Sequence, residues 1–66
     1  MNKNTIGNRL VALRGERSQK EVSAALGIAQ TALCNYERGI RVPRDSIKKL
    51  IAKYYGVSVD SIFFAE

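Results

Sequence analysis

The chain has 66 residues, 45% of them hydrophobic, which is the composition of a small globular domain and excludes a disordered segment. Eleven Lys and Arg residues against six Asp and Glu residues give a formal charge of +5, which suits a polyanionic partner. No run approaches the ~18 consecutive apolar residues of a membrane span, and MNKNTIGNRL lacks the apolar centre of a signal peptide. We expect one domain over residues 1–66, located in the cytoplasm, with no membrane partner.

Residues that carry catalytic or metal chemistry are sparse. The chain has no His, no glycine-rich phosphate loop and no carboxylate pair with an evident reason to share a pocket. Its one cysteine, Cys34, has no second cysteine with which to form an internal disulfide and no basic neighbour in sequence to activate it. The sequence therefore predicts no enzyme activity, no cofactor, no metal and no small-molecule ligand.

The first predicted helix covers residues 4–14. Ile6, Leu10 and Leu13 follow one another at helical spacing and mark its buried stripe. The helix is expected to stop near Gly15, which leaves a short connection to the next element.

A second helix is predicted to begin at Ser18, because Ser18 followed three residues later by Glu21 is a capping box. Gly27 ends this helix at a position that needs left-handed backbone. We expect a buried stripe of Val22, Ala25 and Leu26, and an outward face of Gln19, Lys20 and Ser23.

A third helix is predicted over residues 30–38. Ala32, Leu33 and Tyr36 are expected to face the core, and Ala29 supplies no hydroxyl to cap the helix start. The other face carries mostly polar side chains that can pair with bases or phosphates, namely Gln30, Thr31, Cys34, Asn35 and Arg38. This face is the kind of surface that a helix presents to DNA.

The remaining chain is predicted to hold a loop over residues 40–43, a fourth helix over 44–55 and a short helix that starts at Ser58. The fourth helix is expected to bury Ile47, Leu50, Ile51 and Tyr54. The segment Val57–Phe64 has more apolar residues than a free end leaves in water, so part of it is expected to be buried and the rest to form a dimer interface.

The order of these segments resembles one family closely. The runs IGNRL, SQKEVSAALGIAQTALCNYERGIRVP and IAKYYGVSVDSIF are similar to the Xre/Cro family of phage-repressor-like helix-turn-helix DNA-binding proteins. The resemblance implies an all-α, lambda-repressor-like five-helix bundle with the helix-turn-helix at residues 18–38. It also implies sequence-specific binding of double-stranded DNA, usually as a dimer.

Roles for individual residues combine this resemblance with side-chain chemistry. The residues expected to contact bases are Gln30, Thr31 and Asn35, with Thr31 equally suited to a phosphate. Those expected to contact phosphates are Gln19, Arg38, Arg41 and Arg44. The resemblance further implies that Gln19 and Gln30 brace each other, and that Arg14 and Glu37 form a partly buried ion pair that locks the first helix against the third.

Together these observations predict a homodimeric transcriptional regulator, most simply a repressor, that acts by occupying a pseudo-palindromic operator. Dimerisation is expected through Val57–Phe64. The main alternative is an antitoxin-like or other protein-binding module on the same fold, which would be expected to carry apolar residues on the outward face of residues 30–38. A nonspecific nucleic-acid binder is a third possibility, and it predicts little dependence on base sequence.

Overall fold

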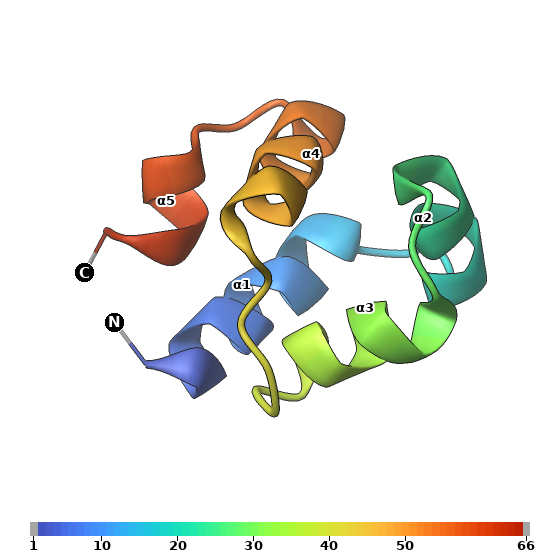
Figure 1. Cartoon of the computed structure of the whole chain (residues 1–66), viewed down its shortest axis with the longest axis horizontal. Helices are drawn as coiled ribbons and strands as arrows, with labels where there is room; N and C mark the ends of the chain where they lie inside the picture. Colours follow the sequence, from blue (N-terminus) through green and yellow to red (C-terminus); the bar gives the residue numbers. More distant parts are fainter. Residues whose placement is uncertain (1, 66) are drawn as a thin grey trace.

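The computed structural model describes residues 2–65, and the regular structure in this range is entirely helical. Figure 1 shows α2 to the right of α1, α3 below and to the right of it, and α4 and α5 above it. The helices are α1 (Lys3–Arg14), α2 (Gln19–Leu26), α3 (Gln30–Glu37), α4 (Asp45–Tyr55) and α5 (Val59–Phe63). The predicted all-α five-helix architecture is confirmed, and no helix in this range is long and apolar enough to span a membrane.

The helix ends follow the sequence signals closely. Ser18 Oγ accepts the backbone N–H of Glu21 at 2.9 Å, and Ser58 Oγ accepts that of Ser61 at 3.1 Å, so both serines cap their helices. Gly27 closes α2 with φ +71°, a left-handed conformation that costs glycine little. These local signals fix where α2 and α5 enter the bundle.

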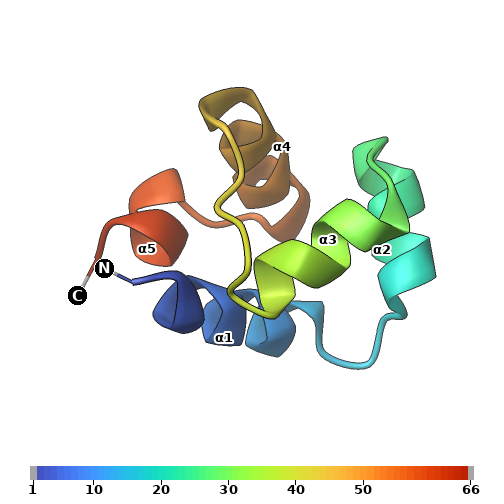
Figure 2. The same ribbon diagram turned by 60° about the horizontal axis from the view of Figure 1, so that its bottom comes forward.

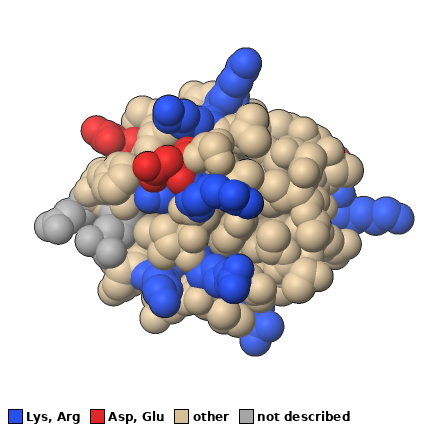
Figure 3. Space-filling model, viewed as in Figure 1, with Lys and Arg blue, Asp and Glu red and all other residues tan. Residues whose placement is uncertain are grey.

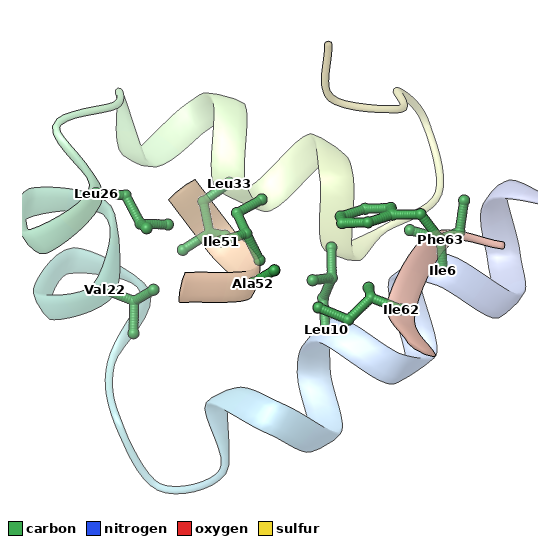
Figure 4. Close-up of a cluster of buried hydrophobic side chains, with 9 residues drawn as sticks. All are labelled: Ile6, Leu10, Val22, Leu26, Leu33, Ile51, Ala52, Ile62 and Phe63. Atoms are coloured by element: carbon green, nitrogen blue, oxygen red, sulfur yellow. The ribbon is translucent and has the colours of Figure 1, made fainter. Parts of the chain in front are cut away.

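One continuous core joins all five helices. Figure 4 shows it extending from the side chains of α2, past those of α3 and α4, to those of α5 and the start of α1. Leu10, Val22 and Ile51 are fully buried. The complete set is Ile6, Leu10, Val22, Leu26, Leu33, Ile51, Ala52, Ile62 and Phe63.

The predicted faces of α2 were wrong at two positions, and Gln19, expected on the outward face, is half-buried. Ala25 is exposed, whereas Ser23, which we expected on the outward face, is buried. The inward face of α2 consists of residues 19, 22, 23 and 26, which is a regular helical spacing. The polar side chains of Gln19 and Ser23 hid this spacing in the sequence. Ser23 tolerates burial because its hydroxyl donates to the carbonyl oxygen of Lys20.

The predicted inner face of α4 was also wrong at one position. Leu50 is 46% exposed, while Ala52 is buried beside Ile51. The buried stripe is turned toward Ile51, Ala52 and the half-buried Tyr55, because α4 packs on both α2 and α5. Leu50 is therefore left as an apolar side chain on the surface.

A glycine in α1 sets the distance between α1 and α3. Gly7 is buried, and a Cβ atom there would collide with the carbonyl oxygen of Glu37 and come within 3.1 Å of the carbonyl oxygen of Tyr36. A side chain at this position would force the two helices apart. Gly7 therefore allows the end of α3 to lie directly on α1.

Candidate nucleic-acid interface

The outward face of α3 forms a shallow polar hollow together with the first residue of α2. We call this surface the α3 hollow and define it by its lining residues, which are Gln19, Gln30, Thr31, Cys34, Asn35 and Arg38. Figure 2 shows α3 across the front of the molecule beside α2. The structure thus brings together five of the seven residues predicted to contact DNA. The half-buried Cys34, which was not predicted to contact DNA, lines the hollow with them.

The N-terminus of α3 borders the hollow, because Gln30 and Thr31 line it. Gln30 and Thr31 are exposed in its first turn, and Ala29 occupies the N-cap position with no side-chain hydrogen bond to the helix. The first-turn N–H groups and the positive end of the helix dipole therefore face outward with two polar side chains. The free N–H groups at such an end can donate hydrogen bonds to a phosphate of a nucleic acid.

Arg41 and Arg44 lie outside the hollow, on the segment that follows α3. Both side chains are exposed. The carbonyl oxygen of Asn35 accepts the backbone N–H groups of Ile40 at 2.9 Å and of Arg41 at 3.3 Å, so the chain folds back over the end of α3. This turn keeps the backbone of Arg41 next to the hollow.

Basic side chains lie near this turn, and others lie at the top, centre and right of the same face (Figure 3). Figure 3 shows Lys and Arg side chains along the lower edge of the molecule, where the end of α3 and the loop after it lie in Figure 1. The acidic groups visible in this view lie toward α4 and α5. Arg38 in the hollow and Arg41 beside it provide positive charge that attracts a polyanion there.

The ion pair implied by the resemblance is present behind the hollow. Arg14 Nε donates to Glu37 Oε2 at 2.7 Å, and Arg14 Nη2 donates to Glu37 Oε1 at 3.0 Å. The Glu37 side chain is only 3% exposed, and its hydrogen bonds raise the pKa of the Arg14 guanidinium. This two-point contact joins the end of α1 to the end of α3.

The sequence did not predict a third donor to the same carboxylate. Gln19 Nε2 donates to Glu37 Oε1 at 2.9 Å, so the amide expected to brace Gln30 makes its hydrogen bond to the buried acid. Gln19 and Gln30 do line the same hollow. The available signal was the helical spacing of Gln19 with Val22, which places it near the inner edge of α2.

Aromatic residues of α4 lie on the other side of the hydrogen-bonded cluster of Arg14, Gln19 and Glu37. The Arg17 guanidinium lies 5.4 Å from the ring centre of Tyr54 and 5.7 Å from that of Tyr55. The Tyr55 hydroxyl is buried and has no hydrogen-bond partner among residues 2–65. Burial, followed by the nearby negative charge of Glu37, raises the pKa of Tyr55.

The fold and this surface together define a helix-turn-helix domain. A family model described as helix-turn-helix matches residues 10–62, which is most of the chain. The chain therefore belongs to the Xre/lambda-repressor-like helix-turn-helix family, a family of DNA-binding regulators. Comparisons with curated proteins and with solved structures gave no significant match.

Proposed function

We propose that this protein is a sequence-specific, double-stranded DNA-binding transcriptional regulator. The observation that carries the proposal is the α3 hollow, whose polar lining is exposed on the second helix of a helix-turn-helix. In this motif the N-terminal residues of the second helix enter the major groove. The polar lining also argues against a protein-binding module, which would be expected to expose apolar residues there.

The proposed contacts divide into two groups. Gln30, Thr31 and Asn35 contact base edges, since amide groups pair bidentately with adenine and a threonine methyl packs against thymine. Phosphate contacts are assigned to Gln19, Arg38, Arg41 and Arg44, which provide affinity without choosing a sequence. All seven lie in the hollow or on the segment that follows it.

We further propose that the protein acts as a homodimeric repressor by occupying a pseudo-palindromic operator. The region Val57–Phe64 supports a dimer because Phe64 is 57% exposed and Val57 is 36% exposed, while Ile62 and Phe63 are buried. A dimer places half-sites about one helical turn, ~34 Å, apart. A monomer in sedimentation at high concentration, together with binding to single half-sites, would contradict this part.

Selection of bound duplexes from a random pool, followed by salt titration, tests the central proposal. We expect an enriched sequence that binds at least about 1,000-fold more tightly than its scrambled counterpart at physiological salt. Both affinities should fall as salt increases, because phosphate contacts release counterions. Equal affinity for both duplexes would indicate nonspecific binding, and no binding to either would favour the protein-binding alternative.

A further inference from the structure

Gln19 belongs both to the α3 hollow and to the buried cluster around Glu37. Its Nε2 donates to Glu37 Oε1 at 2.9 Å, and the same oxygen accepts Arg14 Nη2 at 3.0 Å. The Glu37 side chain is 3% exposed, whereas Gln19 is half-buried and borders the hollow. Gln19 therefore connects a buried carboxylate to the open surface.

The chemistry of the two groups fixes which end of the amide faces inward. An ionised carboxylate only accepts hydrogen bonds, so it selects the NH₂ end of Gln19 over its oxygen. One N–H is used on Glu37, and the second N–H of the same nitrogen is left to donate elsewhere. Gln19 is also the first residue of α2, where backbone N–H groups favour a phosphate.

We propose that Glu37 is a positioning residue for DNA binding, which holds the Gln19 amide so that its second N–H donates to a DNA phosphate. This inference rests on the proposed function. Holding the amide in one orientation reduces the entropy lost when DNA binds. The Arg14 guanidinium neutralises the Glu37 carboxylate, so Glu37 can orient the Gln19 amide without repelling the DNA phosphate.

A double-mutant cycle tests the inference with the duplex enriched by selection. Glu37→Gln preserves the shape of the side chain but replaces one acceptor by a donor, so the Gln19 amide loses its fixed orientation. Gln19→Ala removes the amide itself. We expect Glu37→Gln to weaken duplex binding about tenfold when Gln19 is present and less than twofold in the Gln19→Ala background.

A structural control separates positioning from loss of fold. Ile51→Val trims the core at α4, away from the hollow and from Val57–Phe64, and should lower the melting temperature while leaving duplex affinity within about twofold. All variants are measured at a temperature where circular dichroism shows them folded. Equal losses from Glu37→Gln in both backgrounds would overturn the inference, because Glu37 would then act only by docking α3.

A second measurement uses the unmodified protein and does not depend on any variant folding. In the side-chain amide region of its nitrogen–proton NMR spectrum, one Gln19 Nε2 proton should exchange with solvent more slowly than the Gln30 protons, because Glu37 accepts it. The exposed Gln30 amide provides the comparison in the same spectrum. Gln19 signals with the shifts and exchange rates of Gln30 would contradict the inference, whereas a chain that binds no duplex would instead refute the proposed function.

Discussion

The two ends of α3 are held in different ways. At its C-terminal end the carbonyl groups lie directly on Gly7, and Glu37 is buried in a cluster with Arg14. At its N-terminal end Ala29 provides no cap, and Gln30 and Thr31 are exposed. The contrast shows how one helix serves two purposes, since packing at the buried end fixes its position and leaves the other end open for polar contacts.

The largest expected effect comes from adding a side chain at Gly7, where α1 touches the buried end of α3. Gly7→Ala would normally stabilise a helix, but here its Cβ meets backbone carbonyl groups of α3. We expect a loss of about 3 kcal/mol in the free energy of unfolding, measured by urea titration. Asn8→Ala on the exposed side of α1 is the matched control and should change stability by less than about 0.5 kcal/mol. A stabilising Gly7→Ala would show that the helices are not in close contact.

The ion pair at the same end gives the next largest effect. Arg14→Met leaves the Glu37 carboxylate buried without its charged partner, and we expect a loss of about 2 kcal/mol in unfolding free energy. Asp45→Asn provides the comparison, because the Asp45 side chain is 88% exposed and pairs with Lys48 at 3.6 Å. That surface pair should contribute less than about 0.5 kcal/mol. Equal effects in thermal unfolding would contradict a buried role for Arg14.

At the open end, a cap should stabilise α3. Ala29 has φ −67° and ψ 143°, close to the φ −76° and ψ 155° of Ser18, which does cap its helix. Ala29→Ser should therefore accept the N–H of Ala32 and raise the unfolding free energy by about 1 kcal/mol. The unmodified chain, whose Ala29 makes no cap hydrogen bond, is the control. Identical melting temperatures for Ala29→Ser and the unmodified chain would show that this helix start cannot be capped.

The smallest effect concerns Tyr55, which adjoins the cluster at the buried end. Its raised folded-state pKa means that the neutral phenol is favoured, so its contribution to stability is complete below pH about 10 and declines as the pH rises further. Tyr55→Phe should change stability at neutral pH by less than about 1 kcal/mol. In pH-dependent urea unfolding, the variant should lose less stability above pH about 10 than the unmodified chain. An unchanged alkaline loss would exclude Tyr55 as its source.

Most of the fold could be predicted because its signals are local. Ser18, Gly27 and Ser58 mark helix ends by bonds or backbone conformations that span only a few residues. The faces of α2 and α4 were predicted less well. Ser23 is buried and Leu50 is exposed because tertiary packing, rather than hydrophobicity alone, decides how each helix is turned.

The sequence predicted which residues form the candidate site better than it predicted the hydrogen bonds between them. The hollow contains Gln30, Thr31 and Asn35 because helical spacing alone places them on one face of α3. The bond from Gln19 to Glu37 joins residues 18 positions apart, and nothing local in the sequence specifies it. Gly7 likewise matters through a contact with α3 that only the folded chain creates.

The affinity of Gln30→Ala for selected and scrambled duplexes tests the central claim most directly. We predict that the variant loses roughly 1–3 kcal/mol of discrimination at one base pair, while its binding to the scrambled duplex is unchanged. Arg41→Ala, measured in parallel, should weaken both duplexes alike and reduce the salt dependence. Equal losses on both duplexes for Gln30→Ala would contradict base recognition by the open end of α3.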